Sequence, residues 1–130
     1  MKILLISPTI DANKRTNKGL MMPQLALYIL KGLTPAEHEV KIIEEETDDI
    51  DLDEPCDLVA ISCLTANAPR AYDLCREFKQ RGRTVVLGGV HPTILPDEAL
   101  LHADSVVIGE AEGVWETLLE IRRASCRERV

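Results

Sequence analysis

Residues suited to holding a ligand follow a short apolar segment in the second half of the chain. Residues 84–87 read TVVL, and GGVHPT at 88–93 follows directly. A continuous aliphatic run of this length is typical of a strand buried on both faces. Gly88 and Gly89 have no Cβ and would let a large ligand lie against the main chain, while Pro92 would fix the direction in which the loop leaves. We therefore take 88–93 as a candidate ligand-binding loop.

Three other apolar segments also end in small or polar residues: SPT at 7–9, SCLT at 62–65 and GEAEG at 109–113. If the strands are parallel, all four ends lie at one edge of the sheet, where open α/β sheets bind ligands. The sequence has no GxGxxG or GxxxxGK[ST] phosphate-binding motif, and no His–Asp pair lies near Ser62 in the sequence. This set predicts the holding of a large cofactor, with no catalytic residues in this chain.

The elements that would position these ends alternate along the chain. We expect strands at 2–7, 39–43, 57–63, 84–87 and 104–108, and helices at 24–33, 68–81, 96–100 and 115–121. This alternation is the pattern of a doubly wound α/β fold, in which helices cover both faces of a parallel sheet. Polarity alternates at the start of 39–43, which places that strand nearer an edge.

Helical spacing indicates which faces of the helices are packed, and Gly82 suits the C-cap of the second helix. The residues at this spacing are Leu25, Tyr28, Ile29 and Gly32 in the first helix, Ala71, Leu74, Cys75 and Phe78 in the second, and Trp115, Leu118 and Leu119 in the last.

Composition bounds the class of protein. The chain has 130 residues, 45% of them hydrophobic, which suits one domain with its own core. A net charge of -7 argues against a nucleic-acid partner, and no apolar run is long enough to span a membrane. The first apolar run is too short for a secretory signal, so we expect a cytoplasmic protein.

The four cysteines show no ligand-like spacing, and we expect them to be reduced. We expect the acidic segment 44–53 to be a solvated crossover.

Three stretches together resemble the N-terminal cobalamin-binding domain of radical SAM enzymes. They are DLVAIS at 57–62, GGVHPT at 88–93 followed by Pro96 and Glu98, and ADSVVIGEAE at 103–112. The resemblance covers about residues 1–122. It is carried mainly by GGxHPT and VxGExE together, in this order and spacing.

The resemblance implies a flavodoxin-like, five-stranded parallel sheet of order 2-1-3-4-5, with cobalamin as the cofactor and its nucleotide tail entering beside the strand ends. By position, Ser62 and Thr65 would hydrogen-bond the cofactor, Gly88 and Gly89 would give it room, and Gly109 with Glu110 would close the far side. The cofactor-binding residues that the resemblance implies are Ser7, Pro8, Thr9, Ser62, Leu64, Thr65, Gly88, Gly89, His91, Thr93, Gly109 and Glu110.

The lower ligand of cobalt is a separate matter. Many cobalamin domains carry DxHxxG after the first strand, and its histidine binds cobalt. Here the nearest match, DANKRT at 11–16, lacks both the histidine and the glycine. We therefore expect base-off cobalamin without a histidine ligand. We interpret His91 as a hydrogen-bonding residue that fixes its loop, and His38 and His102 as surface residues.

Radical chemistry needs a CxxxCxxC cluster motif, which these 130 residues do not contain. In this family it lies downstream, so S-adenosylmethionine and a 4Fe–4S cluster would belong to a radical SAM domain of the same parent chain. The resemblance implies a parent enzyme of the methyltransferase type. The alternative is a flavodoxin-like regulatory or interaction domain without cobalamin. A bulky residue in place of Gly89 would separate the two, because it should block a corrinoid but barely disturb an empty turn.

The last residues look foreign to the rest. ASCRERV at 124–130 breaks the preceding helical pattern and resembles the translation of a sequencing-adapter read-through. We expect a cobalamin-binding domain at 1–122, a non-native tail at 123–130, and a natural protein that continues further.

Overall fold

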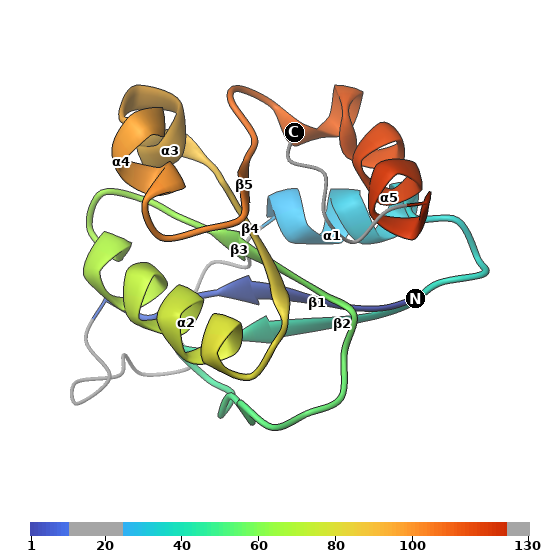
Figure 1. Ribbon diagram of the computed structural model, residues 1–130, viewed down its shortest axis with the longest axis horizontal. Helices are drawn as coiled ribbons and strands as arrows, with labels where there is room; N and C mark the ends of the chain where they lie inside the picture. Colours follow the sequence, from blue (N-terminus) through green and yellow to red (C-terminus); the bar gives the residue numbers. More distant parts are fainter. Residues whose placement is uncertain (11–24, 125–130) are drawn as a thin grey trace.

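The computed structural model describes residues 1–10 and 25–124, and in these ranges five strands form one parallel sheet (Figure 1). The strand order is β2-β1-β3-β4-β5. The bounds are Lys2–Ser7 for β1, Glu39–Glu44 for β2, Leu58–Ser62 for β3, Thr84–Gly88 for β4 and Ser105–Val106 for β5. Every neighbouring pair is parallel, so the predicted fold class and strand order are confirmed, including the edge position of β2.

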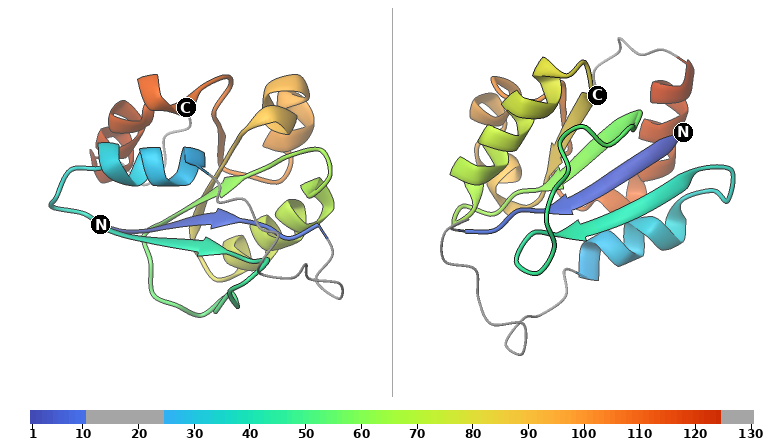
Figure 2. Two further views of the ribbon diagram at one scale, coloured as in Figure 1. Left: turned by 180° about the vertical axis from the view of Figure 1, so that it is seen from behind. Right: turned by 90° about the horizontal axis from the view of Figure 1, so that it is seen from below.

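Helices cover both faces of this sheet, with α1 and α5 on one face and α2 and α4 on the other (Figure 2). Their bounds are Leu25–Leu33 for α1, Ala68–Gln80 for α2, Val90–Ile94 for α3, Pro96–Leu100 for α4 and Trp115–Ala124 for α5, with a 3-10 turn η2 at Ala111–Gly113. In the described part of the chain, no helix has the length and apolar character needed to cross a membrane.

The core forms two apolar layers, one on each side of the sheet. Successive strand residues point to opposite faces, so Val85 and Leu87 pack toward α2 while Val86 packs toward α1 and α5. Both faces are covered, which is why the central strands read as continuous apolar runs rather than as alternating ones.

The predicted packed face of α2 is confirmed, because Ala71, Leu74, Cys75 and Phe78 are fully buried. The helix ends in a Schellman motif in which Gly82 has φ 75° and donates its N–H to Lys79 O at 3.0 Å. The positive φ explains why glycine follows this helix.

The predicted face of α1 is wrong. Its buried residues are Leu27 and Leu30, whereas Leu25 is 69% exposed and Tyr28 and Ile29 are also exposed. The helix reads LALYILKGL. Because it is apolar on nearly every side, its spacing does not select one face.

Two elements end more than one residue away from the expected position. β5 is only two residues long, and the chain turns outward at Ile108, which is 63% exposed. α5 continues to Ala124, past the expected helix end at 121. The described residues do not include the DANKRT segment at 11–16, the expected helix start at Gln24, or residues 125–130 of the expected tail.

Candidate functional site

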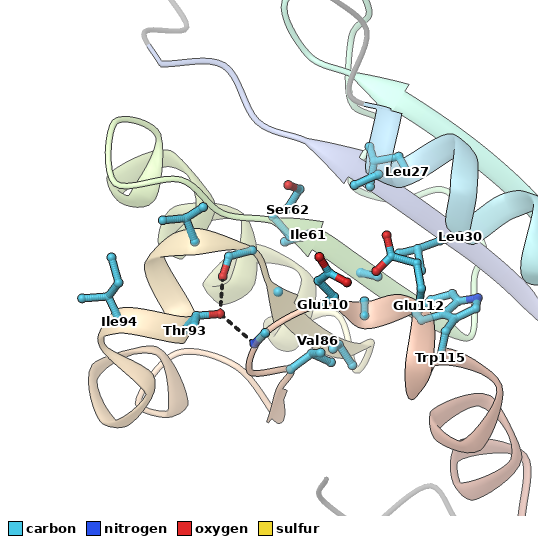
Figure 3. Close-up of a pocket in the computed structure, with 18 residues that line it drawn as sticks. Leu27, Leu30, Ile61, Ser62, Val86, Thr93, Ile94, Glu110, Glu112 and Trp115 are labelled. Atoms are coloured by element: carbon cyan, nitrogen blue, oxygen red, sulfur yellow. Dashed lines mark hydrogen bonds between the residues drawn. The ribbon is translucent and has the colours of Figure 1, made fainter.

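A cavity of about 420 Å³ lies beside the carboxyl ends of β3, β4 and β5, next to α1, η2 and α5 (Figure 3). The residues that line it are Ala26, Leu27, Leu30, Ala60, Ile61, Ser62, Val86, Gly88, Gly89, Val90, Thr93, Ile94, Val107, Gly109, Glu110, Ala111, Glu112 and Trp115. The structure therefore brings the expected residues Ser62, Gly88, Gly89, Thr93, Gly109 and Glu110 together at one cavity.

The cavity wall changes character from its buried part to its opening. The buried lining residues are aliphatic or aromatic, among them Leu27, Val86 and Trp115. The charged lining residues, Glu110 and Glu112, are exposed. A ligand in this cavity would place an apolar part inside and keep its polar part at the opening.

The ring of Trp115 forms part of the cavity wall, and its indole N–H is hydrogen-bonded outside the cavity lining. Its indole N–H donates to Oγ1 of Thr34 at 2.9 Å, and that hydroxyl donates to Leu30 O at 2.7 Å. Sequence spacing indicated that Trp115 faces inward, and its 2% exposure confirms this. Its place in the cavity wall was not foreseen, because it depends on the packing of α5 against α1.

Three glycines, Gly88, Gly89 and Gly109, form the rim of the cavity. They have different physical roles. Gly89 has φ 111°, and a Cβ there would lie 2.8 Å from the carbonyl oxygen of Cys63. A Cβ on Gly88 would lie 3.7 Å from Cβ of Val107, an ordinary contact. Gly89 is therefore required by the close approach of two backbone segments. The expectation that a bulky residue there would barely disturb an empty turn is wrong.

The expected loop at 88–93 contains a short helix, α3, which begins at Val90. Pro92 lies in its first turn, where the backbone N–H groups have no partner within the helix, so proline fits without breaking it. Pro92 thus continues a helix and does not direct an open loop. Oγ1 of Thr93 donates to Gly89 O at 2.8 Å and accepts the N–H of Gly109 at 2.9 Å, which joins two parts of the rim (Figure 3).

His91 does not line the cavity; it sits in a hydrogen-bonded cluster beside it. Its Nε2 lies 2.7 Å from Oε2 of Glu98, and its Nδ1 lies 3.1 Å from Oγ1 of Thr65. The hydroxyl of Tyr72 donates to the same Glu98 oxygen at 2.7 Å. The bonds from Tyr72 and then His91 hold the pKa of Glu98 below its ordinary value. Both ring nitrogens are thus engaged, and the cluster fixes Thr65 relative to α3.

The chain just after β1 is hydrogen-bonded to two acidic residues, Glu45 and Glu46. Thr9 is fully buried, its N–H donates to Oε1 of Glu45 at 3.1 Å, and its hydroxyl donates to Oε1 of Glu46 at 2.6 Å. Arg70 of α2 donates to both oxygens of Glu45, at 3.0 and 2.6 Å. With 2% exposure, Glu45 corrects the expectation that all of 44–53 is solvated.

Asn67 joins the ends of β1 and β3, a role that its place in the sequence does not reveal. Its Oδ1 accepts the N–H of Leu64 at 2.8 Å, and its amide donates to Pro8 O at 3.1 Å. The expected residues Ser7, Pro8, Thr9, Leu64, Thr65 and His91 line no part of the cavity. They belong to the same edge of the sheet, where they shape its loops.

The other histidines differ from their interpretation as surface residues. The side chain of His38 is only 5% exposed, and its Nδ1 lies 3.0 Å from the amino group of Met1. The ring of His102 is partly buried and stacks on Tyr72 with 3.9 Å between centroids. Contacts between distant segments of the chain decide both positions.

The described cysteines are free thiols. Burial raises the pKa of Cys63 to about 11 and that of Cys75 to about 12, so both stay protonated at neutral pH. They act as small apolar side chains, as expected. Cys126 lies outside the described residues.

The fold and the cavity define a class of protein: a flavodoxin-like α/β domain with a ligand-sized cavity at the carboxyl ends of its parallel strands. The family model of the B12 binding domain matches residues 15–119. The chain belongs to this family, which confirms the resemblance to a cobalamin-binding domain and disfavours the alternative of a regulatory domain without cobalamin.

Known relatives are longer than this chain. It is 45% identical over 97 residues to bacteriochlorophyllide d C-8(2)-methyltransferase and 40% identical over 119 residues to bacteriochlorophyllide d C-12(1)-methyltransferase, both of Chlorobaculum tepidum. The matches cover 74% and 90% of this chain but 22% and 26% of those relatives. The uncharacterized methyltransferase PH0819 of Pyrococcus horikoshii is 29% identical over 133 residues, covering 92% of this chain and 29% of that protein.

A solved structure supports the fold alone. The N-terminal domain of the hypothetical protein TM0182 of Thermotoga maritima superposes with a TM-score of 0.50 and 19% identity. The match covers 88% of this chain and 95% of that domain.

Proposed function

We propose that this chain binds cobalamin at the carboxyl edge of its sheet, with the nucleotide tail in the cavity and the corrin ring over the rim. The observation that carries the proposal is an apolar cavity of about 420 Å³ that ends in a glycine-rich rim, in a member of the B12 binding domain family. The apolar lining suits the flat base of the tail, and the exposed rim suits the corrin ring with its polar amide side chains.

The residues present fit such a ligand. The rim at Gly88 and Gly109 carries no side chain, and a Cβ on Gly109 would point into open space. Val90 and Ile94 line the cavity and are 55% and 65% exposed, so they offer apolar surface to a ligand that covers the rim. The hydroxyl of Ser62 has no partner among the described residues, and it would hydrogen-bond the polar part of the ligand at the opening.

We propose base-off binding without a histidine ligand from the described residues. A lower base held in the cavity is separated from cobalt, and His91 is bound at both ring nitrogens by Glu98 and Thr65. The EPR spectrum of bound cobalamin reduced to Co(II) tests this. We expect cobalt hyperfine lines without nitrogen splitting, and nitrogen splitting would contradict the assignment.

We propose a role for this chain in a longer parent protein from the relatives and from the resemblance in sequence. When bound, cobalamin supplies a cobalt centre able to carry a methyl group. The methyltransferase names of the relatives support a parent enzyme of the methyltransferase type, in which a radical SAM domain would bind S-adenosylmethionine and a 4Fe–4S cluster. Within that enzyme, this chain would bind and orient the cofactor and exclude water from its tail.

A fluorescence titration tests the binding site. Trp115, the only tryptophan in the chain, lines the cavity, so hydroxocobalamin should quench its emission saturably. N-acetyltryptophanamide corrects for absorption by the corrinoid. Gly88→Val should weaken binding about tenfold or more, because its side chain narrows the cavity.

Gly32→Val is the matched control for this variant. Gly32 lies in α1 with no atom within 4 Å of an added Cβ, and it does not line the cavity. The Gly32→Val variant should bind cobalamin with the affinity of the unchanged chain. Equal cobalamin affinity of Gly88→Val and Gly32→Val would show that cobalamin does not bind in this cavity.

A further inference from the structure

We infer that the cavity selects corrinoids whose lower base is a benzimidazole over corrinoids whose lower base is a purine. The inference rests on the proposed binding of the nucleotide tail in this cavity. It adds that the wall discriminates between lower bases.

The buried wall offers no free polar side-chain atom among the described residues. It is built from five buried residues: Leu27 and Leu30 of α1, Val86 of β4, Val107 after β5 and Trp115 of α5. The indole N–H of Trp115 is bound to Thr34. A base in this part of the cavity would therefore meet carbon atoms.

The backbone beside the wall is also committed. Ala60 and Val86 face each other in the β3–β4 ladder, and the N–H of Val107 donates to Leu87 O at 2.8 Å. Paired strand groups of this kind are not available to a ligand. The strands thus add no donor or acceptor to the aliphatic wall.

Polar lining groups lie at the opening. The side chains of Glu110 and Glu112 are exposed, and Ser62 is partly exposed (Figure 3). The hydroxyl of Thr93 is bound to Gly89 and Gly109. Glu110 and Glu112 therefore face the part of the ligand that stays in contact with water, and Ser62 offers a single hydroxyl at the edge of the apolar wall.

Base chemistry then decides the preference. Compared with dimethylbenzimidazole, an adenine base adds two ring nitrogens and an amino group, and it lacks the two methyl groups. Buried polar atoms without partners lose their hydrogen bonds to water, which costs about 10- to 100-fold in affinity. The methyl groups gain from the same apolar wall. Both effects favour the benzimidazole.

The test is equilibrium dialysis of the 130-residue chain against three corrinoids. They are cobalamin, its adeninyl analogue and cobinamide, which lacks the nucleotide. We expect cobalamin to bind at least about tenfold more tightly than the adeninyl analogue, and cobinamide to bind more weakly than cobalamin.

Three results would overturn the inference, and they separate it from the proposed function. Equal binding of cobalamin and the adeninyl analogue refutes selectivity but leaves corrinoid binding intact. Equal binding of cobalamin and cobinamide shows that the cavity does not receive the base, while the rim still binds the corrin. Failure of all three corrinoids to bind refutes both proposals.

Adjacent residues of β4 supply matched variants. Val86→Thr places a hydroxyl in the wall and should narrow the preference for the benzimidazole several-fold. Val85→Thr makes the same change on the opposite face, toward α2, and should leave the preference unchanged. The ratio of two affinities cancels a common loss of folded protein, and the comparison on the unchanged chain decides the matter if either variant fails to fold. An equal preference in both variants would contradict the assigned wall.

Discussion

Gly89 is the position where the structure makes its sharpest prediction about stability. Its φ of 111° and ψ of -167° lie in a region that only glycine occupies readily. A Cβ would also lie 2.8 Å from Cys63 O and 3.2 Å from Cys63 N. Two hydrogen bonds hold the backbone of Cys63 in place: Cys63 N donates to Gly88 O at 2.8 Å, and His91 N donates to Cys63 O at 3.1 Å. The backbone cannot move aside without breaking them.

The expected cost of Gly89→Ala follows from two contributions. A non-glycine residue in this backbone region costs about 1–3 kcal/mol, and forcing a methyl group against a fixed backbone costs about 1–3 kcal/mol more. We expect a loss of about 4 kcal/mol in the free energy of unfolding. Gly88→Ala is the matched control, since its Cβ makes only a 3.7 Å contact with Val107. It should change stability by less than about 1 kcal/mol.

Urea unfolding followed by circular dichroism measures both variants. With an m-value of about 1.5 kcal/mol per M, a loss of about 4 kcal/mol lowers the midpoint by roughly 2.7 M. A Gly89→Ala midpoint within about 0.5 M of both the unchanged chain and Gly88→Ala would refute the reasoning. It would mean that the two strand ends are not held in the close approach described.

Three further predictions concern side chains at the same edge of the sheet. Ser62→Ala should weaken cobalamin binding by up to about tenfold without changing the urea midpoint, since it removes one free hydroxyl; unchanged affinity in a titration would remove Ser62 from the site. Arg70→Ala should destabilise the chain by about 3 kcal/mol, because it leaves the buried Glu45 carboxylate unpaired; a loss below about 0.5 kcal/mol in urea unfolding would contradict the ion pair. Because the pKa of Glu98 is lowered in the folded state, its carboxylate stabilises the fold above its ordinary value of 4.5, and this contribution is lost as pH falls below that value. The difference in free energy of unfolding between the unchanged chain and Glu98→Gln should therefore shrink as the pH is lowered from 6 to 3.5. A difference that stays constant would show that the hydrogen bond from Tyr72 does not need the negative charge of Glu98.

The sheet could be predicted from sequence because its signal is local. Continuous aliphatic runs such as 58–61 and 84–87 predicted strands covered on both faces, and the spacing of Leu74 and Phe78 predicted the buried face of α2. In α1 nearly every residue is apolar, so spacing carried no information about which side faces the sheet. Only the packing of Leu27 and Leu30 against β-strand residues settles it.

The site was predicted in outline, and the remainder depends on contacts between distant residues. Strand ends predicted where Ser62, Gly88 and Gly109 gather. The helix at α3 was missed because glycine and proline are usual in loops, although proline in the first turn of a helix removes no hydrogen bond. The pair of Glu45 with Arg70 joins residues from separate elements, and an acidic run in sequence does not reveal which carboxylate is buried.

The central claim, that this edge of the sheet binds cobalamin, is tested most directly by retention of the cofactor. The purified chain is mixed with excess hydroxocobalamin and desalted, and its absorption spectrum is recorded. We predict close to one corrinoid per chain, with a base-off spectrum after reduction. A colourless protein that circular dichroism shows to be folded would contradict it.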